Sequence, residues 1–232
     1  MDTAKDYRIL VLEDAIRRLN ELAGNRKFRM HVEYSKINEA LKQAGSLFYE
    51  VKYSYVSAPQ VAELDSTTRV IEQISLYRKT LEGAIKTTGF KPSTPKELLT
   101  LDEAFYAFRV AEGFKKRLLA PSGSPELAVD VIAVEISQIQ PVADAKNLFE
   151  CRCTDGHRIW RIVTNIKGLK PGVRLACADL PPAEMMGTIS EAMFLGSDPL
   201  PPDTPLGLME APPASALDQA HAQVLHIVKR MV

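Results

Sequence analysis

The sequence is poor in cysteine, tryptophan, net charge and long hydrophobic runs. Its 232 residues include three cysteines and one tryptophan, and 29 basic residues balance 29 acidic ones. Three cysteines cannot form a fully paired disulfide framework, so we expect a reducing compartment and a cytoplasmic protein. No run approaches the roughly 20 apolar residues of a membrane-spanning helix, and acidic residues flank the first apolar stretch. We therefore expect neither a membrane protein nor a secreted one.

The zero net charge is unevenly distributed along the chain. Residues 1–120 contain 20 Lys/Arg and 16 Asp/Glu, a net charge of +4, and residues 121–232 contain 9 and 13, a net charge of −4. A neutral total argues against strong non-specific binding of nucleic acid. The basic first half still allows a local basic surface.

The sequence also lacks the short motifs that carry common catalytic chemistry. It contains no Gly-x-Ser-x-Gly, phosphate-binding loop, Gly-x-Gly-x-x-Gly or His-Glu-x-x-His. Its four histidines are scattered, and no spacing selects a pair of carboxylates. The sequence therefore predicts a binding protein without a cofactor rather than an enzyme.

The three cysteines raise the question of a zinc site. Cys151, Cys153, Cys177 and His157 could supply four ligands. However, Cys-x-Cys is not a zinc-knuckle spacing, and His157 follows a predicted turn. Small buried cysteines are much commoner, so we expect apolar core positions and no metal.

Residues 1–120 show apolar side chains at helical spacing. One stripe consists of Ile9, Leu12, Ile16 and Leu19, and another of Val70, Ile74, Tyr77, Leu81 and Ile85. Asp65 or Ser66 can cap the second of these helices. Thr94, Pro95 and Glu97 have the pattern of a capping box that starts a further helix. The sequence thus predicts a mainly helical domain.

Two other segments of this half are less clear. A shorter helix is expected over residues 36–44. Residues 47–56 alternate apolar and polar side chains as a strand would, but Phe48, Val51 and Tyr55 would also share one helix face. Both interpretations stay open.

The pattern changes after a stretch rich in proline, glycine and serine at residues 120–125. β-branched runs predict strands over residues 129–136, 148–154, 158–164 and 173–177, and residues 193–195 are a candidate fifth. Asp155-Gly156 between the second and third runs indicates a hairpin. Five short strands in about 70 residues favour an OB-fold β-barrel.

The end of the chain combines a proline-rich segment at residues 199–213 with a predicted helix at residues 216–231. The helix has an apolar stripe of Leu217, Ala220, Val224, Ile227 and Val228. Such a stripe must dock on its own domain or on another subunit, and both alternatives stay open. We expect a homo-oligomer, such as a dimer. The predicted fold class is α+β: a helical domain at 1–120, a linker at 121–128, a five-stranded OB-fold barrel at 129–198, and the proline-rich segment with the C-terminal helix at 199–232.

Several segments follow one another in a fixed order: Pro141–Asp144 followed by Leu148, Arg161–Asn165, Gly172–Leu175, Cys177–Met193 and Glu210–Pro213. Together they resemble the tRNA-binding OB-domain family. Its members include the endothelial-monocyte-activating-polypeptide-like proteins and the C-terminal domain of methionyl-tRNA synthetases. The resemblance covers residues 129–213. It implies a five-stranded barrel that binds tRNA by shape, often as a dimer or beside an aminoacyl-tRNA synthetase, and it implies contacts from Ser190 and Met193.

The resemblance is weakest where the family carries positive charge. Pro181, Glu184 and Met186 replace basic residues of the family pattern, and Asp179 replaces its asparagine. Residues 129–198 contain seven basic and nine acidic residues, a net charge of −2. Each lost phosphate contact weakens binding and flattens its salt dependence.

Candidate RNA contacts are residues that can donate hydrogen bonds to phosphate and ribose or stack on bases. In the barrel these are Lys146, Asn147, Arg158, Arg161, Asn165, Lys167, Ser190 and Met193. Trp160 could stack but is favoured as a core residue. In the helical domain Arg26, Lys27 and Arg29 form the densest basic cluster. Lys115–Arg117 form a second one, which is also ordinary in the last turn of a helix.

These observations predict a non-catalytic tRNA-binding protein or an accessory protein of an aminoacyl-tRNA synthetase. In this hypothesis the barrel recognises tRNA by shape and backbone, and the helical domain adds basic contacts. The alternative is a degenerate OB-fold that has exchanged RNA binding for protein interaction and assembly.

Overall fold

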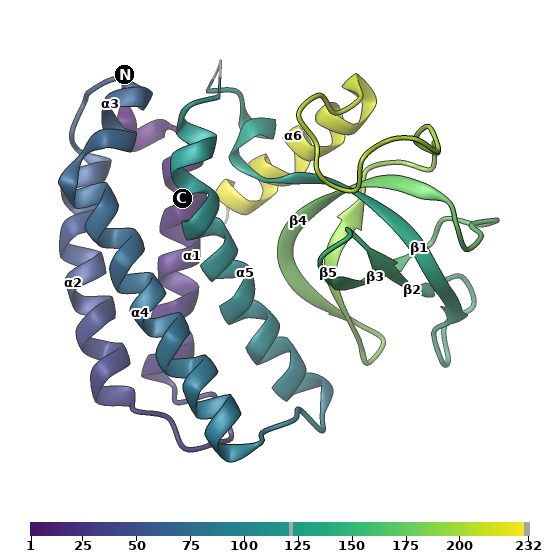
Figure 1. The fold of residues 1–232 in the computed structure, drawn as a ribbon, viewed down its shortest axis with the longest axis horizontal. Helices are drawn as coiled ribbons and strands as arrows, with labels where there is room; N and C mark the ends of the chain where they lie inside the picture. Colours follow the sequence, from purple (N-terminus) through teal and green to yellow (C-terminus); the bar gives the residue numbers. More distant parts are fainter. Residues whose placement is uncertain (121–122, 230–232) are drawn as a thin grey trace. The chain divides into compact units, whose positions relative to one another are not determined.

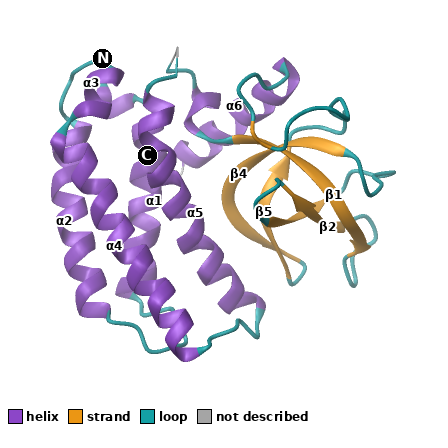
Figure 2. Ribbon diagram, in the orientation of Figure 1, coloured by secondary structure: helices purple, strands orange, loops and turns teal. Residues whose placement is uncertain are grey.

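The chain folds into two units (Figure 1). A computed structural model describes residues 1–120 and 123–229. The helical unit consists of residues 1–128 together with the C-terminal end of the chain from Val224, and the sheet unit consists of Val129–Gln223. Figure 2 shows helices in the first unit and an antiparallel sheet in the second. The predicted α+β class is confirmed.

Five α-helices make up the described residues 1–120. They are α1 (Tyr7–Gly24), α2 (Tyr34–Lys52), α3 (Ala58–Glu63), α4 (Asp65–Thr88) and α5 (Pro95–Leu118). Short 3-10 helices cover Thr3–Lys5 and Pro125–Ala128. The second of these lies in the stretch expected to be a linker, of which Pro121 and Ser122 fall outside the described residues.

The apolar stripes predicted for α1 and α4 form the core of the helical unit. Ile9, Leu12 and Leu19 are almost completely buried, as are Tyr77 and Phe108, whose rings meet edge to face. This burial, rather than intrinsic helix propensity, stabilises helices of this length.

The starts of two helices show what the sequence could and could not predict. The capping box at α5 is confirmed: the backbone N–H of Glu97 donates to Thr94 Oγ1, and Glu97 reaches back to the N–H of Thr94. The predicted cap of α4 is wrong, because the N-cap position is Leu64 and no side chain caps it. Only Leu64 separates α3 from α4, so Asp65 and Ser66 already lie inside the helix.

The ambiguous segment at residues 47–56 is mainly helical. α2 extends to Lys52, well beyond the expected end at residue 44, and Phe48 and Val51 are buried on its inner face. Tyr55 does not share that face because it follows the helix in a left-handed conformation (φ 54°) and is exposed. Packing against the other helices therefore decides between the two interpretations.

The sheet unit contains six strands, one more than expected. They are β1 (Val131–Pro141), β2 (Phe149–Thr154), β3 (Ile159–Thr164), β4 (Arg174–Met185), β5 (Thr188–Phe194) and the two-residue β6 (Gly207–Leu208). All pairs are antiparallel in the order β3-β2-β1-β4-β5, and β6 pairs with β1. The proline-rich segment at residues 199–213 thus contributes β6 to this unit.

β4 and β5 are longer than the sequence predicts. The register of β4 against β5 shifts between Asp179 and Ala183, where Pro181 and Pro182 cannot donate ladder hydrogen bonds. The strand resumes beyond the prolines and turns at Met186 and Gly187, both with positive φ. Two left-handed residues give the twist that a tight hairpin requires. Methionine is unusual at the first position of such a turn, so the sequence does not predict this hairpin.

The three cysteines occupy the core of the sheet unit, as expected. Cys151, Cys153 and Cys177 have no exposed surface and pack in one apolar cluster with Trp160. His157 lies in the exposed turn after β2. Within residues 1–120 and 123–229, no three His, Cys, Asp or Glu side chains are grouped to hold a metal ion.

We expect the sheet unit to lose stability as the pH rises above about 8.5, the pKa of a thiol in an unfolded chain. Burial raises the pKa of the Cys151 thiol to about 11 and also raises the pKa values of Cys153 and Cys177. Above that pH the unfolded state releases protons that the native state keeps, so the free energy of unfolding falls. The loss is up to about 1.4 kcal/mol per thiol and pH unit, and full stability is present at lower pH.

Urea unfolding at pH 7, 8.5 and 10 measures this loss. Trp160 is the one tryptophan of the chain, so its fluorescence follows the sheet unit. Cys151→Ala is the control, because it removes one ionising group and makes the pH dependence shallower. Equal stability at pH 7 and 10 would contradict buried, protonated thiols.

α6 (Ala214–Lys229) is close to the predicted C-terminal helix, whose last expected residues, Arg230 and Met231, lie outside the described part. Ala216, Ala220, Val224 and Ile227 form its buried stripe. Leu217 and Val228, which the sequence assigned to the stripe, are only half-buried. No described helix is both long enough and apolar enough to cross a membrane.

Candidate nucleic-acid interface

A basic cavity lies at the end of the helical unit where α1 leads to α2 and α5 begins, at the bottom of Figure 1. Its volume is about 450 Å³. The lining residues are Asn25, Arg26, Lys27, Arg29, Thr94, Lys96, Glu97 and Thr100. The structure thus brings all three members of the predicted cluster, Arg26, Lys27 and Arg29, to one cavity and adds Lys96 from α5.

The end of α1 positions these side chains. The N–H of Lys27 donates to Leu22 O (3.0 Å) and the N–H of Arg26 donates to Ala23 O (3.0 Å), which is a Schellman motif. Arg26 occupies the left-handed position of this motif (φ 47°), where glycine is strongly favoured. Phe28 then inserts into the core and meets Tyr77 edge to face. The neighbouring cations are consequently held on the exposed side.

The carboxylate of Glu97 also lines the cavity, but it is hydrogen-bonded to the residues just before α5. Glu97 Oε2 accepts hydrogen bonds from the N–H and hydroxyl of Ser93 (both 2.8 Å) and from the N–H of Thr94 (3.3 Å). These bonds, those from Ser93 first, lower the pKa of Glu97. The charge of Glu97 therefore stabilises the positive end of the α5 dipole.

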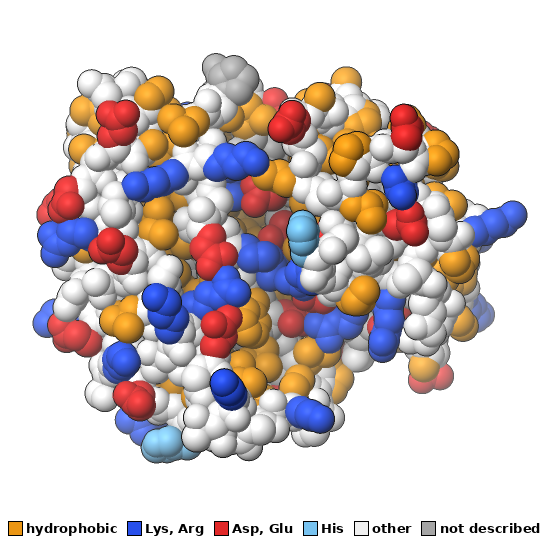
Figure 3. Space-filling view, in the orientation of Figure 1, with side chains coloured by type: hydrophobic (Ala, Val, Ile, Leu, Met, Phe, Trp, Pro, Cys, Tyr) orange, Lys and Arg blue, Asp and Glu red, His pale blue; other side chains and the backbone are white. Residues whose placement is uncertain are grey.

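The four cations of the cavity make no ion pair with any described residue. Arg26 instead lies over the ring of Tyr34, 5.6 Å from its centroid. Elsewhere in the unit arginines are neutralised: Arg78, for example, binds both Glu82 and Glu112. Figure 3 shows basic and acidic side chains interspersed over the lower part of this unit. Cations without an ion-pair partner raise the local positive potential around the cavity.

The second basic cluster predicted from the sequence is used within the helical unit. Lys115 Nζ donates to Thr68 Oγ1 (2.7 Å), and the buried Arg117 donates to Val110 O. Both contacts fit the structural interpretation of this cluster at the end of α5.

In the sheet unit, four predicted RNA contacts are exposed at one end of the sheet. Lys146 and Asn147 lie in the β1–β2 loop, and Asn165 and Lys167 follow β3. The register pairs Phe149, the first residue of β2, with Thr164, the last residue of β3. The β1–β2 loop and the segment after β3 therefore lie at the same end of these strands.

Two other candidates, Arg158 and Arg161, bind the buried Glu191. Arg158 Nη2 contacts Glu191 Oε1, while the N–H and Nε of Arg161 each donate to Oε2 (3.1 Å). Arg158 also covers the indole of Trp160, 4.0 Å from the ring centroid. Trp160 is buried and donates to Asp155 Oδ2 (2.8 Å), which agrees with the core interpretation. These arginines connect β3 with β5.

Ser190 and Met193, which the family resemblance implies as RNA contacts, differ in how deeply they are buried. Ser190 is buried, and its hydroxyl accepts from the N–H of Val163 (2.9 Å) and donates to Ala192 O (2.9 Å). Met193 is half-buried opposite Ala178. Ser190 thus supports the same β3–β5 contact as Glu191.

Lys96 is the functional candidate that sequence reasoning missed. The capping box that begins α5 was recognised, but almost 70 residues separate Lys96 from Arg26. Only the packing of α1 against α5 brings them to one cavity. No local pattern carries that information.

The fold is that of an α+β protein whose helical unit carries a cavity lined by four basic side chains. Residues 1–120 match the family described as an alpha helical domain, and the chain belongs to that family. No curated protein matched the chain in a sequence comparison.

Proposed function

We propose that this protein binds structured RNA, with tRNA as the first candidate, through its phosphate backbone. The basic cavity supports this proposal because its cations are unpaired and no aromatic side chain lines it. Such a lining suits phosphate and ribose rather than a stacked base.

The observation that carries the proposal is the conformation of Arg26. A left-handed arginine costs about 1 kcal/mol relative to glycine, yet this position holds a cation rather than a glycine. Strained residues concentrate where function requires the side chain. A phosphate-binding role accounts for a basic residue at this position.

The sheet unit supports the same proposal through its topology. We infer that β3 and β5 close the sheet into an OB-fold barrel, since Glu191 and Ser190 on β5 accept backbone N–H groups of β3. A closed barrel of this order is what the resemblance to tRNA-binding OB-domains implies. Its contacts would come from the exposed loops with Lys146, Asn147, Asn165 and Lys167.

Arg26→Gly separates binding from stability. Glycine fits the left-handed position, so the thermal unfolding temperature should stay equal or rise slightly, even though the contact with Tyr34 is lost. tRNA affinity at about 50 mM salt should fall roughly three- to tenfold, and the slope of log K against log salt should flatten by about 1. Fluorescence anisotropy with labelled tRNA measures both quantities.

Lys42→Ala is the matched control, because it removes an exposed cation of α2 that does not line the cavity. It should leave tRNA binding nearly unchanged. If the wild-type protein does not bind tRNA at low salt, the proposal is wrong.

That negative result would favour the second candidate function, a protein-interaction module. The β4–β5 turn exposes Met185 and Met186, the latter to 61%, and adaptable methionines are common at protein-binding surfaces. The missing basic residues at 181, 184 and 186 lie in the same hairpin. A partner such as an aminoacyl-tRNA synthetase, or a second copy of the chain, would then bind there.

A further inference from the structure

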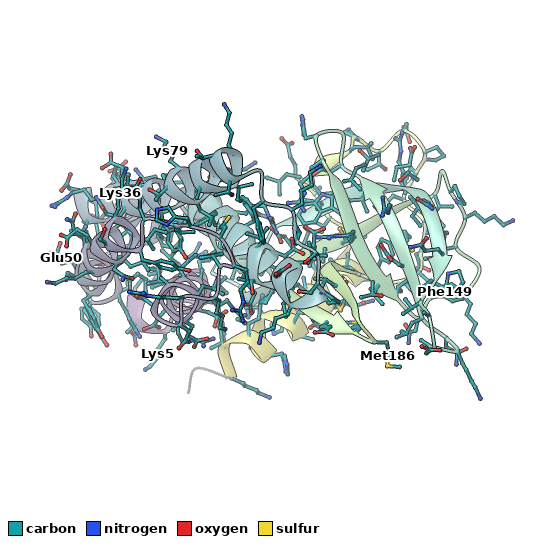
Figure 4. The ribbon with its side chains drawn as sticks, turned by 90° about the horizontal axis from the view of Figure 1, so that it is seen from below. Lys5, Lys36, Glu50, Lys79, Phe149 and Met186 are labelled. Carbon is teal, nitrogen blue, oxygen red and sulfur yellow. The ribbon has the colours of Figure 1, made fainter. Side chains whose placement is uncertain are left out.

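A second basic cavity lies beside the first at the same end of the helical unit. Its volume is about 300 Å³. The lining residues are His31, Glu33, Lys36, Lys79, Thr80, Gly83, Ala84, Thr87 and Thr88. Lys36 of α2 and Lys79 of α4 lie close together in Figure 4, which views the molecule from this end. No sequence motif marks either lysine.

The loop between α1 and α2 separates the two cavities. Four loop residues line the first cavity and two line the second: Asn25, Arg26, Lys27 and Arg29 in the first, and His31 and Glu33 in the second. Apolar side chains hold the loop in place: Phe28 and Val32 are buried, and Met30 Sδ lies 3.9 Å from Thr88 Oγ1. The loop therefore supplies cations to the first cavity, whereas the lysines of the second cavity come from α2 and α4.

Two lysines and one carboxylate, that of Glu33, line the second cavity. Lys36 and Lys79 make no ion pair among the described residues. Its α4 wall is built of small or hydroxyl residues, and a Cβ at Gly83 would meet no described atom within 4 Å. Packing therefore does not require a glycine in the middle of α4, where glycine is unfavourable. The absence of a side chain at Gly83 leaves space in the cavity beside Lys36 and Lys79.

We propose that one RNA strand crosses the loop at residues 25–33 and places separate phosphate groups in both cavities. This inference rests on the proposed function and specifies how the RNA backbone runs over the helical unit. A single small phosphorylated molecule cannot fill two cavities that the loop keeps apart. Lys36 and Lys79 are then phosphate contacts of the same ligand that Arg29 and Lys96 bind.

Salt titration of tRNA binding with paired variants tests this path. Lys36→Ala/Lys79→Ala should weaken binding roughly tenfold at about 50 mM salt and lower the salt slope by about 1.5, as two lost phosphate contacts predict. Arg29→Ala/Lys96→Ala should have a similar effect, and the quadruple variant should show the sum of both slope changes. Gly83→Glu should weaken binding as well, because it places an anion in the second cavity.

Lys5→Ala/Lys42→Ala removes the same charge without touching either cavity, since Lys5 lies apart from Lys36 and Lys79 (Figure 4). Its slope should match the wild type, and circular dichroism should show equal helix content in all variants. If only the Arg29/Lys96 pair lowers the slope, the second cavity is not on the path and the inference fails, while RNA binding stands. If Gly83→Glu leaves tRNA binding unchanged, no phosphate group enters the second cavity and the inference also fails. If tRNA does not bind at all, both the inference and the proposed function fail.

Discussion

Replacing Arg8 with alanine is expected to lower the free energy of unfolding of the helical unit by about 3–5 kcal/mol. Arg8 is 2% exposed and forms a bidentate ion pair with the buried Asp6, at 3.0 Å from Nε and 2.7 Å from Nη2. Its Nη1 also donates to the carbonyls of Arg117 and Leu118 at the end of α5. Without Arg8, Asp6 is a buried carboxylate that has lost its cation, and the end of α5 loses two donors.

The far-UV circular dichroism of the full chain during urea unfolding measures this change, because most helices lie in the helical unit. Arg69→Ala is the control: Arg69 and Asp65 form an exposed pair at 3.7 Å, which contributes about 0.5 kcal/mol or less. A loss below about 1 kcal/mol for Arg8→Ala would show that Asp6 reaches water in the native state.

Replacing Glu191 with alanine is expected to destabilise the sheet unit by about 3 kcal/mol. Glu191 is buried and accepts from the side chains of Arg158 and Arg161 and from the backbone of β3. The two arginines are 33% and 24% exposed, so they regain hydration when the carboxylate is removed. This hydration limits the loss to the lower end of the range for buried ion pairs.

Trp160 fluorescence reports this unfolding directly, since Arg158 covers the indole. Glu191→Gln keeps the acceptor oxygen and should lose less than Glu191→Ala. Glu184→Gln changes an exposed carboxylate on β4 and should be nearly neutral. Equal stability of Glu191→Ala and the wild type would mean that β3 and β5 are held together without these bonds.

The two expected losses concern contacts between residues far apart in the sequence. About 110 residues separate Arg8 from its acceptors on α5, and 30 separate Glu191 from Arg161. Each buried charge is tolerated because several donors and acceptors converge on it. The cations of the basic cavity differ from these buried charges, because they form no ion pair in the described structure.

The sequence alone determined the features that depend on local patterns. The apolar stripe of α1, the capping box at Thr94 and the Asp155-Gly156 hairpin were all predicted, because each involves residues only a few positions apart. The basic cluster of Arg26, Lys27 and Arg29 and the buried cysteines were also identified in advance. Composition and spacing suffice where burial follows directly from periodicity.

Only the tertiary structure decided which of these residues meet. It brought Lys96 and Arg26 to one cavity, brought Lys36 and Lys79 to another, and directed Arg158 and Arg161 to Glu191. It also put Arg26 in a conformation that favours glycine, which no sequence pattern announced. These arrangements depend on how whole helices and strands pack, and the energy of that packing is shared among residues too distant for a local pattern to record.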